Sequence, residues 1–191
     1  MSRINIADTA EIVIKDKRFV LYLTEEKLQK RVRELGSQIT NDYAGKAPVF
    51  IGILNGSFMF MADLIKNIGI DCEIDFMRLS SYGDAKISSG NVTMVKDISC
   101  DITGRDVIVV EDIVDTGLSV SYIEKLMKQH NTASVKIVSL LLKPDSIKYD
   151  VKIDYIGFSI PDKFVVGYGL DYAQKYRNLR SIYVLSENGV L

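Results

Sequence analysis

The chain has 191 residues, 47% of them hydrophobic, and a formal net charge of −1. This length fits one domain, which would bury roughly 70% of the surface that the unfolded chain exposes. General polyanion binders usually carry a clear basic excess, so the balanced charge argues against a nucleic-acid partner.

Histidine and cysteine are scarce, which limits the possible chemistry. Cys72 and Cys100 are too few for a disulfide framework, and we expect them to be reduced thiols in or near the core. His130 is the one histidine, so a His/Cys zinc site or a Ser-His-Asp triad is not expected. Catalysis would then use carboxylates, lysine, backbone amides or an oxygen-bound metal.

No segment of the sequence suggests a membrane. No apolar run approaches the ~20 residues of a spanning helix, and residues 1–19 lack the long apolar core of a signal peptide. We therefore expect a cytoplasmic protein without membrane attachment.

The first predicted elements are a helix and a buried strand. Thr24 can cap a helix that has apolar residues at helical spacing through Ile39. The continuous apolar run at 49–54 is typical of a buried parallel strand. A glycine-containing turn at 55–57 then leads into a second helix, which we expect to end near Gly69.

The next stretch predicts two strands and a long loop. From Ile70 to Phe76, apolar residues alternate with acidic ones, which indicates a strand with one solvent-facing side. Segment 80–91 holds four serines and two glycines without an apolar period, and we interpret it as a mobile loop that returns as a strand from Val92 to Val95. Loops of this length often act as lids or binding loops, although a plain surface connection is the alternative.

The rest of the chain continues the alternation of strands and helices. We expect a helix at 118–127 and strands at 107–110, 135–142, 154–160 and 183–185. This alternation predicts an α/β fold with a mainly parallel central sheet flanked by helices. No repeat or linker divides the chain, so we predict a single domain over 1–191.

A buried strand runs directly into an acidic turn at 107–119, which reads VIVVEDIVDTGLS. Four apolar residues precede Glu111 and Asp112. Ligands of open α/β sheets bind beyond the carboxyl ends of the strands. Two adjacent carboxylates at such a place repel one another, and ribose hydroxyls together with a magnesium ion would compensate them.

A phosphate site is predicted immediately after this acid pair. The sequence Asp115-Thr116-Gly117-Leu118-Ser119 places two hydroxyls and a flexible glycine at the start of a helix. Backbone amides and the helix dipole favour a phosphate dianion there. Asp115 would stand between the sugar hydroxyls and the phosphate, so a ribose 5-phosphate fits both halves. The alternative is a solvated acidic turn before an ordinary capped helix.

These residues resemble the signature of type I phosphoribosyltransferases, and the wider chain is similar to the hypoxanthine–guanine branch of that family. The most specific match is IGFSIPDKFVVGYGLDYAQKYRNL at 156–179. Shorter matches are LNGSFMFMADL at 54–64, EIDFMRLSSYG at 73–83 and LLKP at 141–144. The resemblance implies the type I phosphoribosyltransferase fold, with a lid loop at about 80–91 and a small hood from the N-terminal residues and about 156–180.

The resemblance also assigns residues to an activated sugar, 5-phosphoribosyl 1-pyrophosphate. Glu111 and Asp112 would hold the ribose hydroxyls, partly through Mg²⁺, while residues 115–119 cradle the 5-phosphate. Asp115 would be the candidate general base or proton relay near N7 of a purine. Asp171, which we also place at the purine site, would bind a second magnesium ion.

The turn after the first buried strand resembles the pyrophosphate-binding loop of the family. Asn55 and Gly56 would contact pyrophosphate there together with Arg177, and a non-proline cis peptide is expected in the turn. The family commonly has lysine where this chain has Asn55, so any contact made by that lysine side chain is not expected here.

A purine site is implied by the later matches. Lys143 would hydrogen-bond the 6-oxygen of hypoxanthine or guanine, Phe164 would stack on the ring, and the Val165 backbone would meet its edge. Without the resemblance, Lys143 would be interpreted as a surface lysine. A buried core residue is the alternative for Phe164, and the sequence alone does not separate the two interpretations. Ser81 and Tyr82 would lie on a lid that excludes water from the reaction.

The implied reaction is purine salvage. Hypoxanthine and/or guanine would react through N9 with the activated sugar to give IMP or GMP and pyrophosphate, and the family suggests a homodimer or homotetramer. One alternative is a non-catalytic relative that senses nucleotides and binds RNA, which predicts a basic face that the net charge does not support. Another is a xanthine-preferring or pyrimidine enzyme, of which Lys143 and the 156–179 match disfavour the pyrimidine version.

Overall fold

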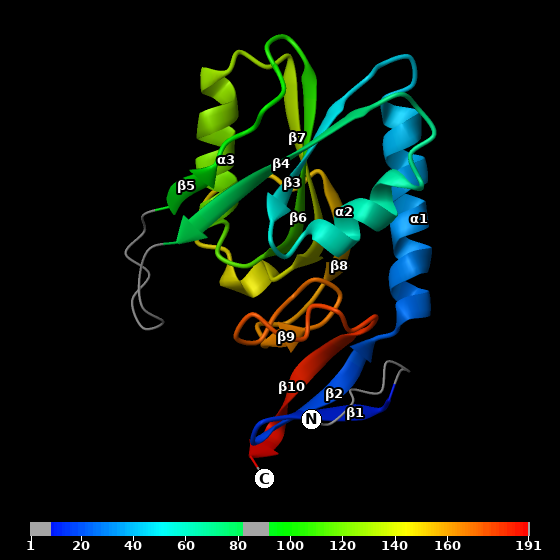
Figure 1. The fold of residues 1–191 in the computed structure, drawn as a ribbon, viewed down its shortest axis with the longest axis vertical. Coiled ribbons are helices and arrows are strands. Elements are labelled where there is room, and N and C mark those ends of the chain that lie inside the picture. The colour runs from blue at the N-terminus through cyan, green and yellow to red at the C-terminus, as the bar shows by residue number, and fades with distance from the viewer. Residues whose placement is uncertain (1–8, 82–91, 191) are drawn as a thin grey trace.

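Two β-sheets organise the computed structural model, which describes residues 9–81 and 92–190 (Figure 1). The larger sheet has the strand order β5-β4-β3-β6-β7-β8. Its strands are β3 (Val49–Leu54), β4 (Glu73–Ser81), β5 (Val92–Lys96), β6 (Asp106–Val114), β7 (Ser134–Leu142) and β8 (Tyr155–Ser159). All neighbours pair in parallel except β5, which lies antiparallel at the edge. The predicted mainly parallel sheet is confirmed.

Helices cover both faces of this sheet. α1 (Glu25–Asp42) and α2 (Phe58–Ile65) lie on one face, and α3 (Leu118–Gln129) lies on the other (Figure 1). The backbone N–H of Lys27 donates to Thr24 Oγ1 at 3.3 Å, so Thr24 caps α1 as predicted.

β6 is apolar on both sides because both of its faces are buried. Ile108 and Val110 pack in the core with α1 and α2, whereas Val107 and Val109 pack in the core with α3. Successive strand residues point to opposite faces, which explains the unbroken apolar run.

A smaller antiparallel sheet lies beyond one end of the larger one, in the order β1-β2-β10-β9 (Figure 1). Its strands are β1 (Glu11–Ile14), β2 (Lys17–Leu23), β9 (Val165–Val166) and β10 (Ile182–Val190). Both ends of the described chain therefore meet in one sheet, through the pairing of β2 with β10. We call this sheet and the connection at 167–181 the hood. It has its own apolar core, which includes Phe19, Leu179 and Tyr183.

The prediction for the strand near residue 70 was wrong in its start and at two positions of its alternation, Ile74 and Asp75. β4 begins at Glu73, and Ile74 is 48% exposed although the pattern placed it inside. Asp75, expected in solvent, accepts hydrogen bonds from the backbone amides of Ser99 and Cys100. A turn from a distant part of the sequence covers that face of the strand, which the local alternation of residues does not encode.

The second helix and the lid segment also differ from the expectations or lie partly outside the described residues. The second helix ends at Ile65 rather than near Gly69. β4 runs through Ser81 and β5 returns at Val92, while the lid residue Tyr82 lies outside the described residues, so the lid stays a prediction. Within the described part of the chain, no helix has both the length and the apolar character needed to cross a membrane.

Candidate active site

The carboxyl ends of β6 and β7 meet at the edge of the sheet that faces the hood. β6 continues into a turn at 115–117 and then into α3, and β7 is followed by Lys143. The backbone N–H of Lys143 donates to the carbonyl of Val114 at 3.0 Å, which fixes one strand end against the other. The sheet edge thus places the predicted phosphate turn beside the predicted purine-reading lysine.

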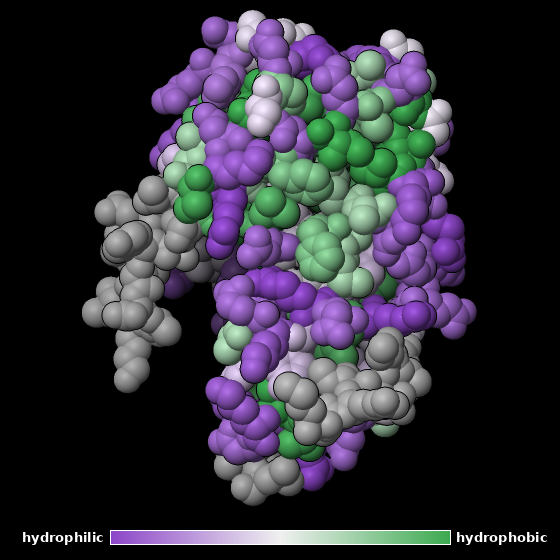
Figure 2. Space-filling view, in the orientation of Figure 1, coloured by the Kyte–Doolittle hydropathy of each residue, from purple (hydrophilic) through white to green (hydrophobic). Residues whose placement is uncertain are grey.

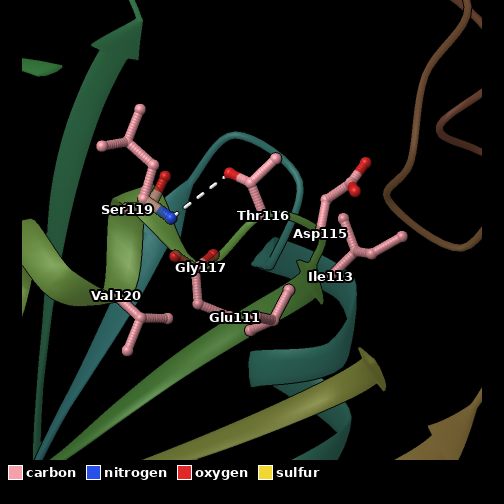
Figure 3. Close-up of a pocket in the computed structure, with 9 residues that line it drawn as sticks. Glu111, Ile113, Asp115, Thr116, Gly117, Ser119 and Val120 are labelled. Atoms are coloured by element: carbon pink, nitrogen blue, oxygen red, sulfur yellow. Dashed lines mark hydrogen bonds between the residues drawn. The ribbon is translucent and has the colours of Figure 1, made fainter. Parts of the chain in front are cut away.

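The phosphate turn encloses a small cavity of about 90 Å³ (Figure 3). Gly117 precedes the first residue of α3 with φ of 84°, a conformation that glycine adopts without a side-chain clash. The backbone N–H of Leu118 donates to Thr116 Oγ1 at 3.4 Å. The first amides of a helix have no intrahelical acceptor, so this cavity offers donors to an anion. It is lined by Glu111 and residues 113–120.

Glu111 and Asp112 line different cavities. Glu111 lies in the phosphate cavity with 5% of its surface exposed. Burial and, second, the neighbouring Asp112 raise the pKa of Glu111 well above its ordinary value. Asp112 lines the next cavity instead. The strand was expected to end at Val110, but β6 continues through Val114, so both carboxylates lie within the strand. Neighbouring strand residues point to opposite faces, which explains why the two side chains line different cavities.

The second cavity, of about 240 Å³, brings together most of the predicted purine and metal residues. It shares Ile113 and Asp115 with the phosphate cavity. Asp115 therefore lies at the border between the two cavities, and its place between the sugar hydroxyls and the phosphate stays a prediction. The lining residues are Asp112, Ile113, Asp115, Lys143, Phe164, Val165, Leu170 and Asp171.

Phe164 presents an exposed ring to this second cavity. Its side chain is 46% exposed, although phenylalanine usually lies in the core. The ring packs edge-to-face against Phe19 at 6.2 Å and against Tyr172 at 5.9 Å between centroids. These contacts hold the orientation of the ring while one surface stays open, as a stacking platform for a flat ligand requires.

Lys143 lies buried between two carboxylates. Its Nζ stands 3.0 Å from Asp115 Oδ2 and 3.0 Å from Asp162 Oδ1. Burial alone would lower the pKa of Lys143, but the hydrogen bonds and charges of the two carboxylates outweigh it, and the net shift is upward. Lys143 is thus held as an ammonium donor. Asp162 was missed, since nothing in the sequence places residue 162 opposite residue 143.

The predicted pyrophosphate turn lies against Asp112. The Leu54–Asn55 peptide is cis, as expected, and the Asn55 residue is exposed. A β-carbon at Gly56 would stand 1.6 Å from Asp112 Oδ2, and one at Gly169 would stand 2.1 Å from the Gly56 carbonyl oxygen. The glycines let the turn, the acidic strand end and the hood pack in direct contact.

Arg177 and Asp171 form an ion pair in the hood. Arg177 Nη2 lies 2.8 Å from Asp171 Oδ1, and Arg177 Nη1 donates to the Gly169 carbonyl at 2.8 Å. Burial raises the pKa of Asp112 to about 6; Arg177 acts to lower it and Asp171 to raise it. Asp112, Asp171 and Arg177 therefore influence one another across the second cavity.

Two carboxylates of this cavity could hold a divalent cation. Among the described residues, no three His, Cys, Asp or Glu side chains are grouped closely enough to form a metal site by themselves. Mg²⁺ is usually bound by one or two carboxylates together with waters and substrate phosphates. Asp112 and Asp171 match that requirement, so the residues fit a cation whose remaining ligands come from the substrate.

This chain is similar to known proteins both in sequence and in structure. The sequence profile of the family described as "Phosphoribosyl transferase domain" matches residues 22–173. The hypoxanthine-guanine phosphoribosyltransferase of Bacillus subtilis is 50% identical over 163 residues, which cover 85% of this chain and 91% of that protein. The protein of the same name from Streptococcus thermophilus is 45% identical over 91% of this chain and 96% of its own length. A crystal structure of a Staphylococcus aureus hypoxanthine phosphoribosyltransferase superposes with a TM-score of 0.84 at 47% identity, covering 88% of this chain and 91% of the other.

Proposed function

The chain belongs to the phosphoribosyltransferase family, and on that premise we propose that it transfers the 5-phosphoribosyl group of 5-phosphoribosyl 1-pyrophosphate to N9 of hypoxanthine and/or guanine. The products are IMP or GMP and pyrophosphate, so the reaction is one of purine salvage. The observation that carries the proposal is the pair of adjoining cavities that share Asp115. One has the form of a phosphate cradle and the other holds a lysine donor beside an exposed aromatic ring.

The sugar half of the reaction uses the strand end and the hood. The turn at 115–119 would hold the 5-phosphate, and Glu111 and Asp112 would lie near the ribose ring. Positive charge builds on the ribose as the bond to pyrophosphate breaks, and fixed carboxylates stabilise such charge. Arg177 and the turn that contains Gly56 would contact the departing pyrophosphate.

The base half uses the second cavity. Lys143 would donate to the 6-oxygen of the purine, Phe164 would stack on its face, and Val165 would meet its edge through the backbone. Asp115 would accept the N7 proton while N9 forms the bond to the anomeric carbon. Because Asp115 already pairs with Lys143, the two groups are held at the same edge of the incoming base.

We further propose that the cation is Mg²⁺, held by Asp112 and Asp171. When bound, it would supply positive charge to the pyrophosphate group of the substrate. The donor set supports this choice, because hard carboxylate oxygens suit Mg²⁺ and leave room for phosphate ligands.

We also propose a cytoplasmic homodimer or homotetramer. Figure 2 shows apolar side chains gathered over α2 and the segment that leads from it into β4. Phe58 is 43% exposed and Ile74 is 48% exposed in this region. A surface of this kind supports an assembly, because contiguous apolar patches often mark protein interfaces. Light scattering after size-exclusion chromatography would measure the mass, and a monomer would contradict the proposal.

The proposed reaction is tested by a spectrophotometric assay with purified protein, the activated sugar and Mg²⁺. Hypoxanthine, guanine, xanthine, adenine and uracil are each supplied as the acceptor base. We expect turnover with hypoxanthine and/or guanine and none with uracil. Absence of turnover with every purine would falsify the proposed function, and turnover of uracil alone would assign a pyrimidine enzyme.

A further inference from the structure

Asp162 contacts the predicted purine-reading lysine without lining the cavity. Its Oδ1 lies 3.0 Å from Lys143 Nζ. The residues that line the cavity include Lys143 and Asp115 but not Asp162, whose side chain is 67% exposed. The ammonium group therefore has one carboxylate that lines the cavity and a second one that does not.

The backbone holds Asp162 in this position. β7 and β8 are parallel neighbours in which Leu142 pairs with Ser159, and the backbone N–H of Ile160 donates to the Leu142 carbonyl at 2.8 Å. Lys143 and Asp162 thus follow the same ends of two joined strands. The N–H of Lys163 donates to the Pro161 carbonyl at 2.8 Å, which closes a tight turn around Asp162.

The charge around Asp162 also favours its ionised form. The hydrogen bond and charge of Lys143 lower the pKa of this carboxyl group most, and the Ser146 hydroxyl and the Lys148 ammonium lower it further. An ionised Asp162 is the form that holds a lysine ammonium.

A lysine ammonium has three N–H donors and no acceptor. In the structure, one donor points to Asp115 and one to Asp162. The third can serve a carbonyl oxygen such as the 6-oxygen of a purine, but not a 6-amino group, which also donates. If Asp115 takes up the purine proton, it becomes neutral, and Asp162 is then the remaining countercharge of Lys143.

We propose that Asp162 is a positioning residue that aims the Lys143 ammonium at the 6-oxygen and keeps it charged while Asp115 receives the proton. This inference rests on the proposed function, since it assigns Asp162 a part in choosing 6-oxopurines. It also predicts that losing the Asp162 charge weakens base recognition and leaves sugar recognition intact.

The test compares Asp162→Asn with the wild type in the complete protein. We expect the KM for hypoxanthine to rise about tenfold, the scale of one lost hydrogen bond to a charged group, while the KM for the activated sugar changes by less than about twofold. Asp162→Glu should recover most of the loss. Asp145→Asn is the matched control, because Asp145 is an exposed carboxylate two residues from Lys143 in sequence. That control should behave like the wild type.

The ratio of hypoxanthine to adenine use is a second measure. Asp162→Asn should lower this ratio. A purely structural role would instead raise the KM for hypoxanthine and the KM for the activated sugar together and leave the ratio unchanged. The inference would be overturned by an unchanged KM for hypoxanthine, or by equal increases in the KM for hypoxanthine and the KM for the activated sugar. In either case, turnover by the wild type would still support the proposed function. A wild type inactive with every purine would instead overturn the proposed function, and the role of Asp162 with it.

A third readout does not depend on turnover. An amine-reactive reagent at a fixed pH of about 9 labels neutral lysines, and peptide mass spectrometry measures the label on Lys143. We expect faster labelling of Lys143 in Asp162→Asn than in the wild type, with Lys136 as the internal reference. Equal labelling rates would show that the carboxylate does not hold the ammonium in solution and would overturn the inference.

Discussion

The Asp112 carboxylate lies directly against Gly56, so that a β-carbon at position 56 would fall 1.6 Å from Asp112 Oδ2. That separation is far shorter than any non-bonded contact, and either the turn or the carboxylate must move to accept a side chain. The pyrophosphate turn and the acidic end of β6 are therefore one packed unit.

Gly56→Ala is expected to lower kcat/KM for the activated sugar by 10²-fold or more, since misplacement of reacting groups by about 1 Å can cost that much. Steady-state kinetics with varied sugar would measure the loss, and thermal unfolding would check that the protein is folded. Gly69→Ala is the control, because its β-carbon would meet only the Thr40 side chain, at 3.3 Å. Equal kinetics of the two variants would contradict the packing argument.

Asp112→Asn should make the free protein more stable and at the same time inactive. Burial raises the pKa of Asp112 to about 6, above the ~3.9 of an unfolded aspartate. Between these values the folded state binds the proton more tightly, so this group makes the free energy of unfolding fall as pH rises from about 4 to 6. The asparagine side chain of the variant does not ionise, so the variant does not lose this part of the free energy of unfolding as pH rises.

Thermal unfolding without substrate or metal measures the effect of the amide. We expect the variant to exceed the wild type by ~1–3 kcal/mol at pH 8 and by little at pH 4, since one pKa unit corresponds to about 1.4 kcal/mol. Asp145→Asn should show no such pH-dependent gain. A variant less stable than the wild type at pH 8 would mean that the Asp112 charge stabilises the fold.

Asp115→Asn should reduce turnover by ~10²–10⁴-fold, the usual scale for a lost acid–base group. Sugar binding should change little, because the other residues that line the phosphate cavity, Thr116 to Ser119 among them, stay unchanged. Single-turnover kinetics and calorimetric binding of the activated sugar separate the two effects. Turnover equal to that of the wild type would remove Asp115 from the proton transfer.

Tyr168→Phe should loosen the hood where it rests on α2. The Tyr168 hydroxyl donates to Asp63 Oδ2 at 2.7 Å, and the residue is 1% exposed with φ of 51°. We expect a stability loss of ~1–2 kcal/mol from this hydrogen bond to a charged group, together with a raised KM for the activated sugar. The KM for hypoxanthine should stay near its wild-type value. Tyr149→Phe, at an exposed tyrosine, is the control, and indistinguishable melting curves would contradict the anchoring role.

Sequence patterns predicted those features that depend on neighbouring residues. The cap of α1 by Thr24, the buried strand β6 and the helix start after Gly117 all follow from residues a few positions apart. The first cavity, around residues 113–120, follows from the same local order, because a strand end and a helix start are adjacent in the chain. The second cavity also takes Lys143, Phe164 and Asp171 from later segments, and only the family resemblance pointed to those residues.

Features that depend on distant segments could not be predicted in the same way. Asp162 reaches Lys143 only because β8 lies beside β7, and Tyr168 reaches Asp63 across 105 positions of sequence. Asp75 appeared solvent-facing because its amide donors, Ser99 and Cys100, come from a separate turn. Strand order and register decide these contacts. The alternation of apolar and polar residues along one strand predicts neither of them.

The pairing of β2 with β10 joins segments at opposite ends of the described chain, as the contact of Leu23 with Ile182 shows. Closing a loop of that length carries a large entropic cost, and contacts of high sequence separation form slowly during folding. The phosphate turn, by contrast, is made from one contiguous stretch. During folding, the protein should therefore acquire the ability to bind a phosphate before it can distinguish one nucleobase from another. Selectivity for the base would be the last property to form.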